Sequence, residues 1–179
     1  ITCDDQLMRT QSSGIVEGMR LVLHLFPNAK GVIAIEDNKP EAIEAMTHAC
    51  EGDANLSVLP VMAKYPEGGE RSLIGVVTGR QLRFGQLPAD LGCVVCNVST
   101  LNAIYRAVCK TEPLMGRLFT VSGDAVANPH TLFVRIGTSC SELLKAAGGI
   151  KPGSEARKIL CGGPMMGIAM STLDAPVAK

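Results

Sequence analysis

Hydrophobic residues in the first part of the chain follow two different periods. Between Ser13, the expected N-cap, and Pro27, apolar residues recur at helical spacing. Residues 31–35 form a short continuous apolar run, which is typical of a strand buried on both faces. A helix with Pro40 in its first turn and a second strand at 56–59 follow. Strand, helix and strand at this spacing predict a βαβ unit with a parallel sheet.

The pattern continues with a third apolar run at 92–97 and a helix from Val98, and then it changes near Pro113. Residues 118–123 and 131–136 are predicted strands, followed by a helix that begins at the capping box Ser139–Glu142. Residues 158–160 are a further predicted strand. We therefore predict an α/β fold, with a Rossmann-like parallel-sheet domain at 1–112 and a small α+β β-grasp domain at 113–179.

One stretch, residues 64–79, interrupts the sheet pattern with glycines and then continues as an apolar helix. Gly68 and Gly69 permit a positive φ or the close approach of a ligand. The following helix would present free N–H groups and the positive end of its dipole, which suits an anionic or electron-accepting cofactor. In open α/β sheets ligands bind at this carboxyl edge. The alternative is a simple strand-to-helix turn.

Composition restricts the classes of function. The 179 residues carry 17 basic and 17 acidic side chains without a basic stripe, so we expect no nucleic-acid partner. No apolar run approaches the ~20 residues of a membrane span. The seven cysteines lack the paired spacing of a disulfide framework, which indicates a reducing, cytoplasmic setting.

No metal site is predicted. Cys93 and Cys96 would face opposite sides of the expected strand, and no further ligands occur at matching spacing. The three histidines are isolated from one another in the sequence. Glu36 and Asp37 follow a predicted strand, where they could contact a ligand or form a solvated turn.

Five segments carry a family resemblance in combination: Ile1–Met8, Ile35–Ile43, Lys64–Glu70, Asn97–Thr100 and Gly162–Gly167. Together they resemble RnfC, the family of peripheral subunits of the Rnf electron-transport complex. That family is similar to the FMN-binding subunit of respiratory complex I. The resemblance implies a Rossmann-like flavin domain followed by a soluble-ligand-binding β-grasp domain.

This resemblance implies an electron-transfer subunit of a membrane-associated, ion-translocating ferredoxin:NAD oxidoreductase. The implied cofactors are FMN, 4Fe-4S clusters and, as a further candidate, NAD. The implied partners are other Rnf subunits and NADH or ferredoxin, at the cytoplasmic face of the inner membrane. The alternatives are a soluble reductase, of the cobalamin-reductase type or serving an amino-acid reductase, and a non-catalytic docking or ligand-binding module.

The resemblance also implies cofactor-binding residues. Two sequences of the complex I protein line its flavin, Gly-Glu-Glu and Val-Asn-Asn-x-x-Thr. Gly69 replaces the first acid and Cys96 replaces an amide here. The family's glycine-rich loop is expected before Ile1 and its iron–sulfur ligands after Lys179, so we expect the chain alone to be inactive and to bind FMN weakly or not at all. The matching positions are Gly68, Gly69, Glu70, Val95, Cys96, Asn97 and Thr100.

Overall fold

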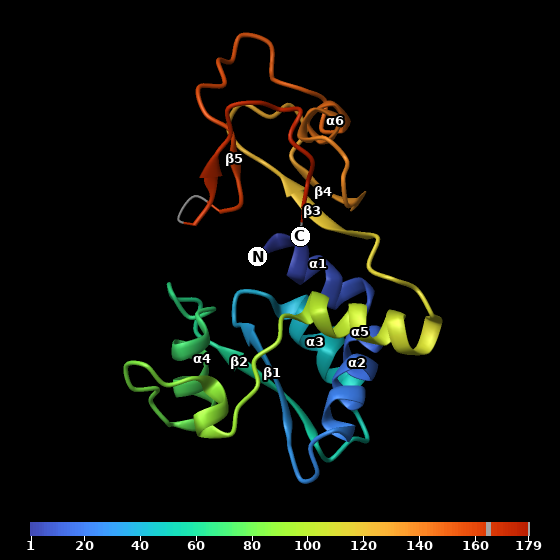
Figure 1. The fold of residues 1–179 in the computed structure, drawn as a ribbon, viewed down its shortest axis with the longest axis vertical. Coiled ribbons are helices and arrows are strands. Elements are labelled where there is room, and N and C mark those ends of the chain that lie inside the picture. Colours follow the sequence, from blue (N-terminus) through green and yellow to red (C-terminus); the bar gives the residue numbers. More distant parts are fainter. Residues whose placement is uncertain (164–165, 179) are drawn as a thin grey trace. The chain divides into compact units, whose positions relative to one another are not determined.

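The computed structural model describes residues 1–163 and 166–178, and it divides the chain into two compact units. Unit 1 contains nearly all residues up to Pro113, and unit 2 begins at Leu114 (Figure 1). Unit 1 holds a parallel sheet with helices, and unit 2 holds small antiparallel sheets with one helix. The predicted fold class, α/β followed by α+β, is confirmed.

Two successive helices open unit 1, α1 (Thr2–Thr10) and α2 (Ser12–His24). Ile15 and Val16 of α2 are among the most deeply buried side chains of the protein. The N-cap predicted at Ser13 is wrong. The N-cap is Gln11, two residues earlier, and its side chain makes no capping hydrogen bond. Gln11 is also the C-cap of α1. The start of α2 is therefore determined by the junction between the two helices and not by a capping side chain.

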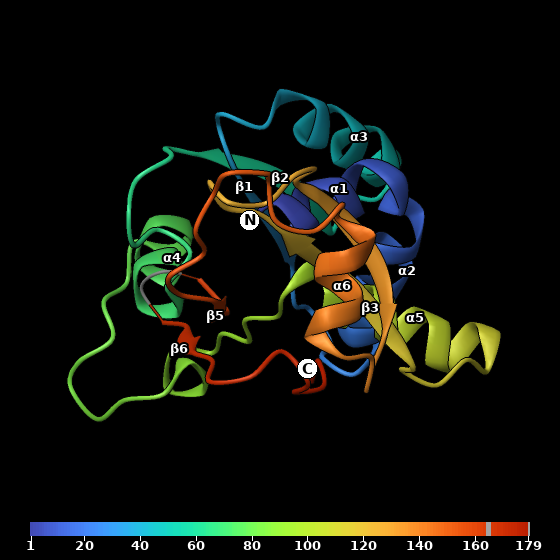
Figure 2. The ribbon, with the colours of Figure 1, turned by 90° about the horizontal axis from the view of Figure 1, so that it is seen from above.

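The predicted βαβ unit is confirmed by β1 (Gly31–Glu36), α3 (Pro40–Cys50) and β2 (Leu56–Val61). The strands are parallel over their whole length, from the Gly31–Leu56 pair to the Glu36–Val61 pair. Alternate residues of β1 are buried, and Met46 of α3 is completely buried. Helix α4 (Glu70–Thr78) lies on the opposite side of the strand pair from α2 (Figures 1 and 2).

The third strand, predicted at 92–97, is wrong. The 3-10 helix η1 (Pro88–Leu91) ends at Gly92, whose φ of 68° turns the chain. The Cys93 N–H therefore donates back to the Pro88 carbonyl, at 3.0 Å. Val94 and Val95 that follow are exposed, and the sheet of unit 1 consists of β1 and β2 within the described residues. Cys93 and Cys96 therefore do not lie on opposite faces of a strand.

Helix α5 (Val98–Lys110) follows and packs against α2 through two glycines. A Cβ added to Gly18 would overlap the carbonyl of Leu101, and one on Gly14 would overlap the amide oxygen of Asn102. The two helices thus approach one another as closely as backbone allows. This contact holds α5 in a fixed place beside α2.

Unit 2 begins with the antiparallel pair β3 (Gly116–Val121) and β4 (His130–Arg135) and continues with α6 (Cys140–Ala146). The capping box of Ser139 and Glu142 is confirmed. The strand predicted at 158–160 begins only at Leu160, as β5 (Leu160–Cys161), and pairs with β6 (Ile168–Ala169). Pro164 and Met165, between these strands, lie outside the described residues.

The core of unit 2 is small and joins residues that are distant in sequence. Val134, Leu143 and Val177 form one buried cluster, and Val126 and Ala147 are buried as well. The backbone of Val177 bonds in both directions, accepting from the Gly137 N–H and donating to the Thr138 carbonyl. The sequence near Val177 does not predict these two hydrogen bonds, because their partners, Gly137 and Thr138, lie about forty positions earlier.

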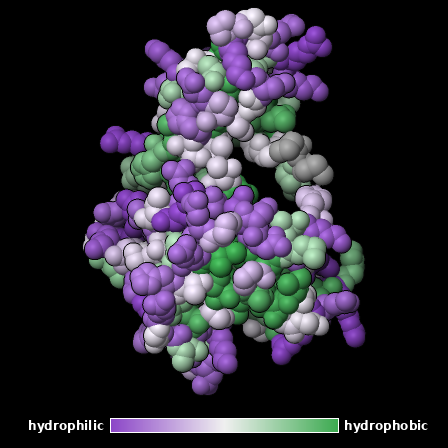
Figure 3. All heavy atoms as spheres, turned by 180° about the vertical axis from the view of Figure 1, so that it is seen from behind, coloured by the Kyte–Doolittle hydropathy of each residue, from purple (hydrophilic) through white to green (hydrophobic). Residues whose placement is uncertain are grey.

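Hydrophobic side chains are not confined to the interior. Figure 3 shows them gathered on one face of unit 1, the lower body in that view. Phe84 at a turn is fully exposed, and Tyr65 and Leu87 are mostly exposed. Helices of the length and apolarity that a membrane crossing requires do not occur in the described part of the chain.

Candidate functional site

The first candidate group, Gly68–Glu70, lies where α4 begins. The loop after β2 is shaped by two backbone hydrogen bonds, from the Glu67 N–H to the Lys64 carbonyl at 2.7 Å and from the Gly69 N–H to the Pro66 carbonyl at 2.8 Å. Gly69 is the N-cap of α4, and no side chain caps the helix there. The first N–H groups of a helix have no partner within it, so this end offers backbone donors to a ligand.

The two glycines at this end of α4 differ from each other in what surrounds them. Neither has a positive φ, so unusual backbone conformation is not their role. A Cβ built on Gly68 would meet nothing within 4 Å, whereas one on Gly69 would lie 2.9 Å from the Pro66 carbonyl oxygen. Gly68 therefore leaves open space beside the helix end, and Gly69 is required by the tight turn.

The second candidate group, Val95–Thr100, lies where α5 begins. Asn97 is the N-cap, and its Oδ1 accepts a hydrogen bond from the Ser99 N–H at 2.8 Å. Its Nδ2 donates to Oδ2 of Asp4, at 3.1 Å, across 93 positions of sequence. Val95, Cys96 and Thr100 are exposed around it. This helix end is thus both capped and tied to α1.

The structure brings the seven candidate residues together as two groups, each at the amino terminus of a helix. No hydrogen bond or ion pair joins one group to the other within residues 1–163 and 166–178. Sequence reasoning missed Asp4. Its contact with Asn97 leaves no local pattern, because it depends on where α1 and α5 lie in the folded unit.

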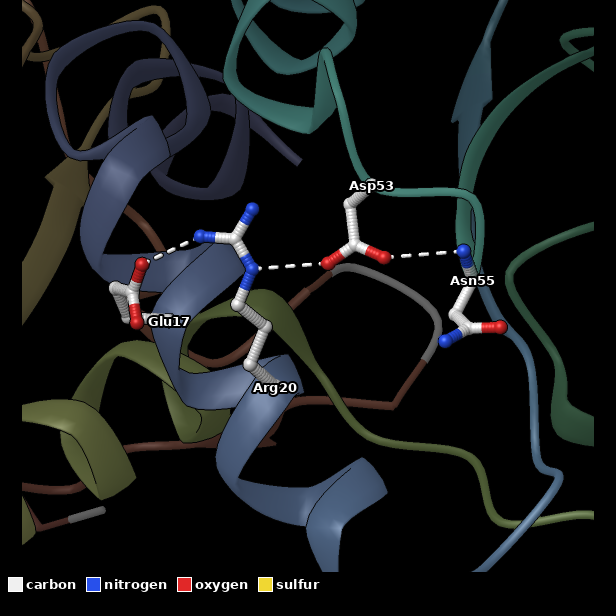
Figure 4. Close-up of polar contacts among 4 residues, drawn as sticks. All are labelled: Glu17, Arg20, Asp53 and Asn55. Atoms are coloured by element: carbon white, nitrogen blue, oxygen red, sulfur yellow. Dashed lines mark hydrogen bonds and ion pairs between the residues drawn. The ribbon is translucent and has the colours of Figure 1, made fainter.

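A polar network joins α2 to the turn that precedes β2 (Figure 4). Arg20 bonds to Glu17 at 2.5 Å and to Asp53 at 3.0 Å, and Asp53 also accepts from the Asn55 N–H at 3.0 Å. The hydrogen bond from Arg20, followed by that from Asn55, lowers the pKa of Asp53. The network joins α2 to the turn before β2, so it supports the fold rather than a ligand.

Asp37, which the sequence also offers as a possible ligand contact, has a structural role. Asp37 Oδ1 accepts from the Ala63 N–H at 3.1 Å, which holds the loop after β2. Burial raises the pKa of the Cys50 thiol, so this cysteine is a poor nucleophile. In the ranges that the structure describes, no three or more His, Cys, Asp or Glu side chains are placed to hold a metal ion.

Comparison with known families gives this geometry a context. Residues 1–106, more than half of the chain, match the family model of the Nuo51 FMN-binding domain. The chain belongs to the Nuo51 FMN-binding domain family. Residues 118–169 match the SLBB domain, and so the second match falls within unit 2.

Several curated proteins match this chain over all 179 residues. The chain is 44% identical to a subunit of the proton-translocating ferredoxin:NAD(+) oxidoreductase complex of Clostridium ljungdahlii and covers 38% of that protein. It is 41% identical to a subunit of the Na(+)-translocating complex of Acetobacterium woodii, covering 40%. A subunit of the ion-translocating oxidoreductase complex of Yersinia enterocolitica is 40% identical, and the chain covers 25% of it. The chain thus spans a quarter to two-fifths of these relatives.

The chemistry of the two helix ends fits part of a flavin. The edge of the flavin ring carries carbonyl oxygens and ring nitrogens, which pair with backbone N–H, amide and hydroxyl groups. The end of α5 offers the Asn97 amide and the Thr100 hydroxyl, and the open space at Gly68 would admit a flat ring. Arg71, the cation beside the first group, makes long contacts of 3.4 Å to the carbonyls of Leu82 and Arg83.

Proposed function

We propose that this chain is part of an electron-transfer subunit of an Rnf-type, ion-translocating ferredoxin:NAD oxidoreductase complex. The observation that carries the proposal is the 40–44% identity, over the whole chain, to proteins named as subunits of such complexes. The FMN-binding family of residues 1–106 supports a redox role, because flavins are electron carriers.

In this proposal the two helix ends contact the FMN ring. Gly68, Gly69 and Glu70 would form one side, with the ring lying against the open face of Gly68. Val95, Cys96, Asn97 and Thr100 would form the other, with Asn97 and Thr100 offering polar groups to the ring edge. Bound FMN would supply the chemistry, since a flavin can accept a hydride and release electrons singly. The protein's residues bind and orient the ring.

The two units would have separate tasks. Residues 1–112 would form the flavin-domain part and residues 113–179 a soluble-ligand-binding β-grasp domain. The relatives' names support ferredoxin and NAD as electron-transfer partners and other complex subunits as binding partners. A peripheral position on the cytoplasmic face of the membrane and 4Fe-4S clusters bound outside this chain complete the proposal.

Quenching of FMN fluorescence by the purified chain tests the flavin proposal. We expect binding weaker than micromolar, because the two helix ends supply contacts to the ring, whereas the phosphate needs its own cradle of backbone N–H groups. Gly68→Val should weaken the binding further by filling the open space. Gly75→Val is the control, since a Cβ at Gly75 meets only the Arg80 carbonyl at 3.7 Å. Equal binding by both variants would overturn the assignment of Gly68, and micromolar or tighter binding would show that the chain holds a complete FMN site.

A further inference from the structure

The side-chain amide of Asn97 is held from both ends. Its Oδ1 accepts from the backbone N–H of Ser99, and its Nδ2 donates to the carboxylate of Asp4. A backbone N–H can only donate and an ionised carboxylate can only accept. Turning the amide over would place Oδ1 against the Asp4 oxygen and Nδ2 against the Ser99 N–H, so both contacts would become repulsive. The orientation of the amide is therefore fixed.

This arrangement leaves a defined hydrogen-bonding capacity at the start of α5. An amide nitrogen has two N–H donors, and an amide oxygen has two lone pairs. Asp4 takes one donor and Ser99 takes one lone pair, so one N–H and one lone pair of Asn97 are left for a ligand. Asn97 is exposed, which makes these groups accessible.

Asp4 itself is well placed to act as an anchor. It lies in the first turn of α1, where the positive end of the helix dipole favours a carboxylate. Leu7 and Met8 of the same helix are buried, so α1 has a firm base in unit 1. Asn97 is also held in place, because α5, which it caps, packs against Gly14 and Gly18 of α2. The Asp4–Asn97 bond thus joins two well-supported helices.

We propose that Asp4 is a positioning residue for the flavin-contacting amide of Asn97. Asp4 does not touch the flavin in this proposal. It fixes which way the Asn97 amide faces, so that the remaining N–H is directed outward before a ligand arrives. The inference rests on the proposed function, because it takes Asn97 as a flavin contact. Preorganising a donor lowers the cost of binding, since less side-chain freedom is lost.

Three variants of the chain test the proposal. Asp4→Ala removes the acceptor, Asp4→Asn keeps a neutral acceptor, and Asp5→Asn is the control. Asp5 lies in the same turn of α1, but its side chain pairs with Arg9, at 3.8 Å, rather than with Asn97. Two quantities are measured by ¹⁵N NMR, the side-chain NH₂ signals of Asn97 without ligand and the affinity for FMN.

We expect Asp4→Ala to move the Asn97 side-chain signals towards those of a free amide and to weaken FMN binding about 2- to 12-fold, the equilibrium equivalent of one hydrogen bond. Asp4→Asn should restore part of both effects, and Asp5→Asn should change neither. A shift of the Asn97 signals with unchanged affinity would overturn the positioning role. So would a loss of affinity in Asp5→Asn equal to that in Asp4→Ala.

Failure of the proposed function looks different from failure of this inference. If FMN leaves the backbone signals of residues 95–100 unchanged in the wild-type chain, the flavin contact at α5 is wrong and the positioning role falls with it. If FMN changes those signals equally in wild type and Asp4→Ala, the contact stands and only the role of Asp4 is wrong.

Discussion

The amino termini of α4 and α5 are two solutions to the same problem, the unpaired N–H groups of a helix start. Helix α4 begins at Gly69 without a side-chain cap, beside open space at Gly68. Helix α5 begins at Asn97, which caps it and is tied to Asp4. The first end leaves its donors and its space to a ligand, and the second offers a fixed amide. One flavin contact would thus be adaptable and the other preorganised.

Helix α5 is also held by its contact with α2, and we expect this contact to contribute more to stability than either helix start. Gly18→Val would place a side chain on the Leu101 carbonyl, and backbone cannot give way as a flexible side chain can. We expect a loss of about 3 kcal/mol or more in the free energy of unfolding, at the upper end of overpacking effects. Urea unfolding measures it. Gly75→Val is the matched control, because a Cβ there would make only an ordinary contact with the Arg80 carbonyl, at 3.7 Å. Equal losses in the two variants would show that helix propensity rather than the contact decides stability.

Capping of α5 should have a smaller effect. Asn97→Ala removes the bond to the Ser99 N–H and that to Asp4, and we expect it to cost about 0.5–2 kcal/mol of unfolding free energy. Asn97→Ser retains a capping oxygen and should lose much less. Asn97→Asp also retains a cap but sets a second carboxylate against Asp4, so it should be less stable than Asn97→Ser at neutral pH. Thermal unfolding that ranks Ala and Ser equally would contradict this assignment.

At α4 the same kind of change should barely affect stability. Gly68→Val fills space that nothing occupies, and we expect the free energy of unfolding to stay within about 0.5 kcal/mol of wild type. FMN binding should fall in the same variant. A large loss of stability would show that the space at Gly68 is needed by the fold, and the comparison between the two helix ends would lose its basis.

These helix ends also show what could be predicted from the sequence. Both helices, the βαβ unit and the Ser139–Glu142 capping box follow from local spacing and were predicted. The strand at 92–97 was not correct, because its apolar pattern has no neighbouring strand to pair with among the described residues and Gly92 turns the chain. The Asp4–Asn97 hydrogen bond and the packing of Val177 against Val134 and Leu143 could not be predicted. Both depend on residues that are distant in sequence, and the periodicity of a single sequence carries no information on such contacts.

The smallest expected effect concerns the dependence of stability on pH. The pKa of Asp53 is lowered in the folded protein by hydrogen bonds from Arg20 and Asn55. A carboxyl group with a lowered folded pKa stabilises the fold above its unfolded pKa, and this contribution is lost as the pH falls through the folded value. Asp53→Asn should therefore flatten the acid limb of the stability curve. Glu155→Gln, which removes an exposed pair with Arg157, should leave the limb unchanged. If stability falls with decreasing pH in the same way in wild type and Asp53→Asn, Asp53 does not contribute to the acid dependence of stability.

In the function that we propose, the starts of α4 and α5 contact one flavin. A ¹⁵N NMR titration of the chain with FMN in large excess tests it most directly, because it detects weak binding and locates it. We expect concentration-dependent shifts at residues 68–72 and 95–101, reduced at the first group by Gly68→Val and at the second by Asp4→Ala. Shifts at only one helix end, or shifts confined to unit 2, would contradict it.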